Sequence, residues 1–105
     1  MRAVITGATS GIGKAMACQL AQEGWSLVLT GRNQTVLEQL QKNLPTAVEI
    51  LPLDLAEEEA PYQLFDFCKK KRVDLLVNNA GFGIFGRFTE TNLQEEMDLL
   101  AVNVR

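Results

Sequence analysis

Histidine is absent from the 105 residues of this chain. A histidine-liganded metal site and a histidine general base are therefore excluded for these residues. Cysteine occurs only as Cys18 and Cys68. Both fall in predicted helices, far apart in the sequence, which favours two reduced, buried thiols over a disulfide framework or a close-spaced metal site. We therefore expect the chain to reside in the cytoplasm, where thiols stay reduced.

Strong charge of one sign and long apolar runs are missing as well. The net charge is -3, so no basic field attracts a nucleic acid or an anionic membrane. No apolar run approaches the roughly 20 residues that a membrane span requires. The basic run at residues 69–72 closes a predicted helix, where cations suit the helix dipole. We expect no nucleic acid and no membrane as partners.

Strand-like and helix-like segments alternate along the chain. Short apolar runs typical of buried strands occupy residues 2–5, 26–30, 48–53 and 73–77. Helical periodicity is found at residues 13–23, 35–44 (with Thr35 and Glu38 spaced as a capping box), around 61–68, and from Asn92 through Val104. This alternation predicts an α/β fold in which a parallel, doubly wound sheet has the strand order 3-2-1-4.

That strand order places a switch point between the first and fourth strands. Ligands of doubly wound sheets bind at the carboxyl ends of the strands beside such a point. Both rims of the crevice lie in this chain, at residues 7–13 and 78–81. We therefore look for the binding site there.

A glycine-rich loop, T-G-A-T-S-G-I-G, follows the first strand and opens the first helix. Its first glycine lets the chain turn sharply, the second lets backbone approach a pyrophosphate, and the third lets the helix pack close to the sheet. The helix N-terminus then offers free N–H groups and partial positive charge to the phosphates. The loop thus predicts a dinucleotide site. Its expected contacts are Gly7, Thr9, Ser10, Gly11, Ile12 and Gly13.

This loop has two alternative interpretations. A phosphate loop of the ATPase kind needs G-x-x-x-x-G-K-S/T, but Ala8 stands at its first glycine and Ala15 at its magnesium-binding hydroxyl. That alternative is excluded. A glycine turn that binds no ligand stays open.

Four signatures together resemble the short-chain dehydrogenase/reductase family, and the resemblance covers the whole chain in register. They are Thr6-Gly7-x-x-x-Gly11-Ile12-Gly13, Asp54, Asn78-Asn79-Ala80-Gly81, and Asn103 in a V-N context. The resemblance implies that residues 1–105 are the N-terminal portion of a single NAD(P)-binding Rossmann domain. It also implies an oxidoreductase that interconverts a small-molecule carbonyl and an alcohol and is a homo-oligomer when intact.

The resemblance assigns further cofactor contacts. Asp54, with Leu55 beside it, is expected at the adenine ring, where a carboxylate and a neighbouring backbone N–H can read an amino group and a ring nitrogen. The stretch Asn78, Asn79, Ala80 and Gly81 is expected to hold the switch point together and to line the cofactor cleft. For both segments, a plain turn remains the alternative.

The end of the second strand bears on the choice of nicotinamide cofactor. An NAD enzyme places Asp or Glu there to bind the ribose 2′-hydroxyl, whereas this chain reads Thr30-Gly31-Arg32-Asn33. The Arg32 guanidinium can pair bidentately with a 2′-phosphate. We therefore predict NADP(H) in preference to NAD(H). A solvated arginine in a surface turn is the alternative.

The catalytic group that the resemblance implies is largely missing from these residues. The family uses a tyrosine, a lysine four residues later and a serine, but the sole tyrosine, Tyr62, is followed by Asp66 at that spacing. Only Asn103 matches, as the residue that holds a water in the proton relay from a kinked helix. We interpret the chain as truncated before the fifth strand, which leaves the fourth strand with an unpaired edge. The rival interpretation is a non-catalytic dinucleotide-binding or sensor module.

Overall fold

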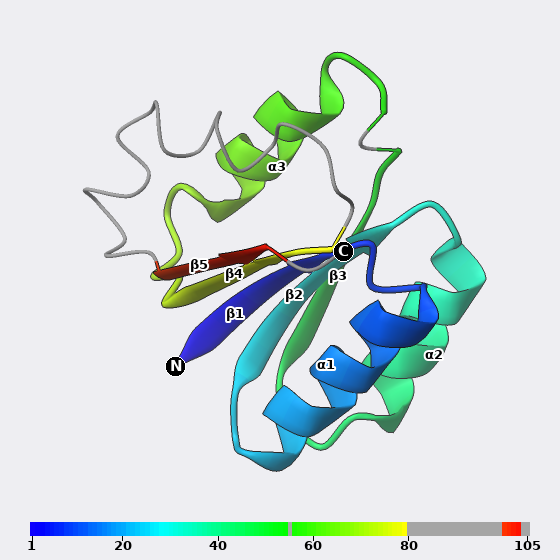
Figure 1. Ribbon diagram of the computed structural model, residues 1–105, viewed down its shortest axis with the longest axis vertical. Helices are drawn as coiled ribbons and strands as arrows, with labels where there is room; N and C mark the ends of the chain where they lie inside the picture. The colour runs from blue at the N-terminus through cyan, green and yellow to red at the C-terminus, as the bar shows by residue number, and fades with distance from the viewer. Residues whose placement is uncertain (55, 80–99, 104–105) are drawn as a thin grey trace.

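The computed structural model describes residues 1–54, 56–79 and 100–103 (Figure 1). Strands and helices alternate through most of this chain, as the apolar pattern predicts. The elements are β1 (Arg2–Thr6), α1 (Gly11–Gln22), β2 (Ser26–Gly31), α2 (Gln34–Asn43), β3 (Val48–Pro52), α3 (Ala60–Cys68), β4 (Leu75–Asn78) and β5 (Leu100–Asn103).

The strands form one parallel sheet in the order β3-β2-β1-β4-β5. The predicted order 3-2-1-4 is confirmed within it. β1 is the strand from which the chain winds both ways, since it pairs with β2 on one side and with β4 on the other. The switch point therefore lies between β1 and β4, as expected.

The C-terminal part of the sheet corrects two expectations. Helical periodicity was expected to continue through Val104, yet Leu100–Asn103 forms β5 and pairs in parallel with β4. The expectation of a sheet that stops at an unpaired fourth strand is therefore wrong. A short apolar run fits a helix and a buried strand equally well, and the N–H and C=O groups along an open edge favour pairing. The expected start of that helix, Asn92, lies outside the described residues.

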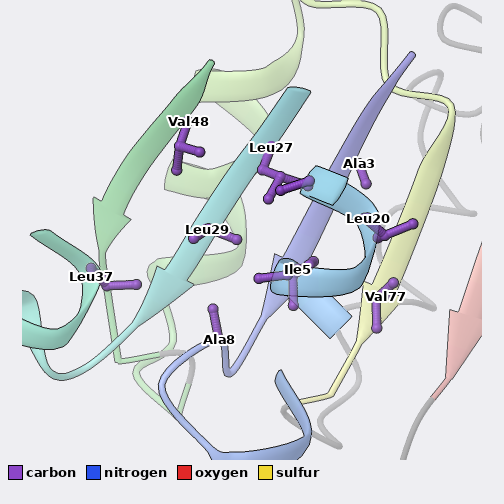
Figure 2. Packing of buried hydrophobic residues seen from close by; sticks show 11 residues of the cluster. Ala3, Ile5, Ala8, Leu20, Leu27, Leu29, Leu37, Val48 and Val77 are labelled. Atoms are coloured by element: carbon purple, nitrogen blue, oxygen red, sulfur yellow. The ribbon is translucent and has the colours of Figure 1, made fainter. Parts of the chain in front are cut away.

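Helices cover both faces of the sheet. α1 and α2 lie on one face and α3 on the other (Figure 1). Alternate strand residues face each layer, because successive side chains of a strand point to opposite sides. The layer under α1 and α2 includes Ile5, Leu27, Leu29, Val77, Leu20 and Leu37 (Figure 2). The layer under α3 includes Val4, Val28, Leu76, Leu64, Cys68 and Val73.

Side chains and glycine set the helix ends. α1 begins after Ser10, whose hydroxyl accepts from the Gly13 N–H at 3.1 Å. It is followed by Gly24, whose φ of 91° suits glycine alone. α2 begins after Asn33, whose side chain accepts from the Val36 N–H at 3.2 Å. The expected capping box at Thr35 is therefore wrong, because Asn33 already occupies the N-cap.

The layer under α3 yields a stability prediction. Leu64 is fully buried against the sheet, so Leu64→Ala removes contacts that the surrounding side chains cannot fully replace. We expect the free energy of unfolding to fall by about 2–5 kcal/mol. Urea denaturation followed by circular dichroism measures this loss. The neighbouring exposed residue provides the control, since Gln63→Ala is expected to change the value by less than about 0.5 kcal/mol.

The buried thiol of Cys68 yields a pH prediction. Burial raises its pKa from 9.0 to about 12, with Lys71 opposing the rise and Glu49 adding to it. The unfolded chain loses this proton first, so the free energy of unfolding should decline as the pH rises from 9 towards 12. Below pH 9 the thiol is neutral in both states and contributes no slope. Equilibrium unfolding across this range should show a shallower decline for Cys68→Ala than for the unchanged chain; equal slopes would contradict the assignment.

Candidate functional site

The carboxyl ends of three neighbouring strands meet at the switch point. β1 ends at Thr6, which lies opposite Asn78 at the end of β4. On the other side of β1, the Ala8 N–H donates to the Thr30 carbonyl oxygen of β2 at 2.9 Å. The glycine-rich loop therefore leaves β1 between the ends of β2 and β4, where ligands of doubly wound sheets bind.

Two glycines give this loop its shape. Gly7 has a φ of 63°, so the sharp turn that the sequence predicts does use the left-handed region. A Cβ on Gly13 would lie 2.2 Å from the Gly7 carbonyl oxygen and 2.8 Å from the Ala8 Cα. The close approach expected at Gly13 is thus an approach of α1 to the turn backbone.

The outer side of the loop is open. A Cβ on Gly11 would meet no atom within 4 Å among the described residues, and Ile12 is 47% exposed. The first N–H groups of any helix lack intrahelical acceptors. At α1 these belong to Gly11, Ile12 and Gly13, of which the Gly13 N–H donates to the Ser10 hydroxyl. The open side of α1 therefore has the chemistry of an anion site.

The loop also lies against the end of β2. A Cβ on Gly31 would lie 3.0 Å from the Thr9 Cγ2 atom, so Thr9 packs directly beside Gly31. Arg32 follows in an exposed position, and neither ion pair found among the described residues includes it. Asn33 is occupied as the cap of α2. The structure thus brings Thr9 and the backbone of Arg32 to one corner of the site.

Asp54 takes part in the turn after β3. Its Oδ1 accepts from the Ala56 N–H at 3.0 Å, and its carbonyl oxygen accepts from the Glu57 N–H at 2.9 Å. The turn role that remained an alternative is therefore present. The turn uses the Oδ1 atom of Asp54. The Oδ2 atom has no hydrogen bond among the residues that the structure describes. Leu55 lies outside those residues.

Asn78 bridges two strand ends, as its position predicts. It is buried, and its Oδ1 accepts from the Thr6 hydroxyl at 3.1 Å. Asn79 points to the glycine loop, where its Nδ2 donates to the Gly7 carbonyl oxygen at 2.9 Å. Ala80 and Gly81 lie outside the described residues.

Asn103 is not in a helix. It ends β5 and pairs in parallel register opposite Asn78, so both residues belong to the carboxyl edge of the sheet. The kinked helix expected around it is wrong for the same reason that β5 exists: the open edge of β4 favours strand pairing.

Thr6, the partner of Asn78, was not among the predicted site residues. A signal was available, because each of the two residues is the polar residue that ends an apolar strand. Among the described residues, no group of three or more His, Cys, Asp or Glu side chains could hold a metal ion. No helix in that same part of the chain is long and apolar enough to cross a membrane.

Comparison with known proteins gives the family. The family model for short chain dehydrogenase matches residues 1–105. An uncharacterized oxidoreductase of Staphylococcus epidermidis is 32% identical over 108 residues, covering 98% of this chain and 46% of that protein. The chain thus spans just under half the length of this relative.

Solved structures agree in fold. L-sorbose reductase from Gluconobacter frateurii, complexed with NADPH and L-sorbose, is 33% identical with a TM-score of 0.66; the match covers 77% of this chain and 33% of that one. NAD+-bound xylitol dehydrogenase is 30% identical with a TM-score of 0.67, covering 77% of this chain and 33% of the other. Because the family model matches every residue and a relative aligns with nearly all of them, the chain belongs to the short-chain dehydrogenase family.

Proposed function

We propose that this chain binds NADP(H) at the carboxyl edge of its sheet. The observation that carries the proposal is the glycine loop, which leaves β1 at the switch point and presents the open N-terminus of α1. Residues 1–105 would then be the N-terminal portion of one NAD(P)-binding domain. The whole protein would be an oxidoreductase that interconverts a carbonyl and an alcohol.

Each part of the cofactor has a candidate partner in this arrangement. The N–H groups of Gly11 and Ile12 would bind the pyrophosphate, since they lie at the open end of α1. The Oδ2 atom of Asp54 would accept from the adenine amino group, with Leu55 beside it. Asn78 would line the cofactor cleft, and the resemblance to the family gives Ala80 and Gly81 the same role.

Arg32 supports NADP(H) in preference to NAD(H). The two solved relatives bind different cofactors, NADPH in one and NAD+ in the other, so family membership alone does not decide. Arg32 is exposed beside Thr9 and Gly31, without a partner in the described ion pairs. A guanidinium there would attract a 2′-phosphate, and Thr9 would add a hydroxyl donor.

The bound nicotinamide would supply hydride transfer, and the protein would supply the proton and the orientation of the substrate. In the family, a tyrosine activated by a lysine four residues later moves that proton. Asn103, at the same edge of the sheet as Asn78, would contribute to the proton relay. The substrate would be a small molecule, and the intact enzyme a homo-oligomer. Two free thiols fit the reducing cytoplasm.

A non-catalytic dinucleotide-binding or sensor module is the second candidate. Tyr62 favours it for these residues taken alone, because that tyrosine lies on α3 with Asp66 four positions later. Both candidates bind the cofactor, and only the enzyme turns it over.

The cofactor preference can be tested at Arg32. We expect Arg32→Ala to weaken NADPH binding relative to NADH by at least about tenfold, or roughly 1.4 kcal/mol, because the pairing with the 2′-phosphate is lost. Fluorescence titration of both nucleotides measures this ratio. Lys69→Ala removes the same charge from the exposed residue after α3, at the opposite edge of the sheet, and should leave the ratio unchanged. If Arg32→Ala weakens NADPH binding relative to NADH by less than about tenfold, the assignment of Arg32 to the 2′-phosphate is wrong.

Turnover can be tested on the 105-residue chain itself. We expect it to bind NADPH without oxidising it in the presence of carbonyl compounds, because Tyr62 has no lysine four residues later. The absorbance of NADPH is the readout, and a rate of NADPH oxidation above that of buffer alone would contradict this expectation. Reading the coding sequence past Arg105 then separates the two candidates: a Tyr-x-x-x-Lys motif favours the enzyme, and a stop codon favours the sensor.

A further inference from the structure

Three hydrogen-bond donors converge on one backbone oxygen in the glycine loop. The Gly7 carbonyl oxygen accepts from the Ser10 N–H at 3.2 Å, from the Ser10 hydroxyl at 2.9 Å and from Asn79 Nδ2 at 2.9 Å. The same oxygen lies 2.2 Å from where a Cβ of Gly13 would be. This carbonyl is therefore enclosed by the loop, the first turn of α1 and the residue that follows β4.

The hydroxyl of Ser10 has no hydrogen-bonding capacity left. A serine hydroxyl offers one hydrogen to donate and two lone pairs to accept. Ser10 Oγ donates to the Gly7 carbonyl oxygen and accepts from the Gly13 N–H at 3.1 Å and from Asn79 Nδ2 at 2.5 Å. A cofactor phosphate could bind this hydroxyl only after one of these bonds had broken.

The side-chain amide nitrogen of Asn79 is equally occupied. Its two hydrogens serve the Gly7 carbonyl oxygen and Ser10 Oγ. Because a carbonyl oxygen can only accept, the orientation of the amide group follows from the Gly7 contact. Asn79 lies 72 residues from Gly7 and 69 from Ser10, so it joins the end of β4 to the phosphate side of the site.

We propose that Asn79 is a positioning residue that acts on the cofactor through Ser10 and Gly7, without touching the cofactor. The hydrogen bonds among the Gly7 carbonyl oxygen, Ser10 Oγ and Asn79 Nδ2 form a lock on the loop. Ser10 belongs to this lock and is not a phosphate ligand. The inference rests on the proposed function and reassigns two residues that the sequence analysis expected to contact the cofactor. In this loop, Thr9 is the residue whose hydroxyl keeps capacity for a ligand, since no hydrogen bond of its side chain is found among the described residues.

The lock has a distinct signature in binding. The loop holds the pyrophosphate, which NADPH and NADH share, whereas Arg32 addresses the 2′-phosphate of NADPH alone. Loss of the lock should therefore weaken both nucleotides by the same factor. Loss of Arg32 should change their ratio.

The first test is Asn79→Asp, which keeps the size of the side chain but places an acceptor-only carboxylate against the Gly7 carbonyl oxygen. We expect the Kd for NADPH and for NADH to rise at least about tenfold, with their ratio constant within about twofold. Fluorescence titration at a temperature where circular dichroism shows every variant folded gives both constants. The exposed Asn43→Asp adds the same charge at the end of α2 and should leave both unchanged.

The second test is a double-mutant cycle between Ser10→Ala and Asn79→Ala. If Asn79 acts through Ser10, the double variant should bind little more weakly than the weaker single variant, because one lock is lost in each case. Ser10→Thr keeps a capping hydroxyl and should restore binding to within about threefold of the unchanged chain. This cycle decides the question even where Asn79→Asp fails to fold.

Three outcomes would overturn the inference. An unchanged Kd in a folded Asn79→Asp variant contradicts the lock. Multiplicative losses in the cycle make Ser10 a ligand in its own right, and a change in the NADPH to NADH ratio places Asn79 at the 2′-phosphate end. If the unchanged chain binds neither nucleotide, the proposed function falls and takes this inference with it, so the two failures are distinguishable.

Discussion

The turn at Gly7 is the constraint on which the rest of the site depends. At this residue the chain leaves the strand from which the sheet winds both ways, in a conformation with a φ of 63° that favours glycine. The turn lets α1 begin close to the Gly7 carbonyl oxygen. The approach is so close that a Cβ on Gly13 would require the backbone to shift. The open N–H groups of α1 are consequently presented at the switch point, where a parallel sheet binds its ligands.

At the carboxyl edge of the sheet, the strand residues change from apolar to polar at the ends of three neighbouring strands. Thr30, Thr6 and Asn78 end or nearly end β2, β1 and β4, and all three are at most 1% exposed. The Thr6 hydroxyl donates to the Asn78 side-chain Oδ1, and this buried hydrogen bond joins the ends of two strands. Below these strand ends both faces are packed with aliphatic side chains. The polar residues at these strand ends are therefore held in place by buried neighbours.

Family membership explains the scaffold but not the choice of ligand. Structures similar to this chain in fold hold NADPH in one case and NAD+ in another. The difference between such sites is expected at the end of β2, where Gly31 leaves room for Thr9 and Arg32 follows in an exposed position. The glycine loop and Asn79 would serve the part of the cofactor that both nucleotides share. In the proposed function, binding of a dinucleotide and choice between dinucleotides would be carried by different residues of one edge.

The sequence by itself determined the order of elements, the strand order around β1 and the location of the glycine loop, because local periodicity and turn residues specify these features. It could not decide the last segment, Leu100–Asn103, whose apolar residues fit a helix or a strand until the open edge of β4 is present. Nor could it reveal that the Ser10 hydroxyl and the Asn79 side-chain nitrogen use their full hydrogen-bonding capacity within the loop, partly on each other. That lock joins residues 69 positions apart, and only the folded sheet brings their donors and acceptors within hydrogen-bonding distance.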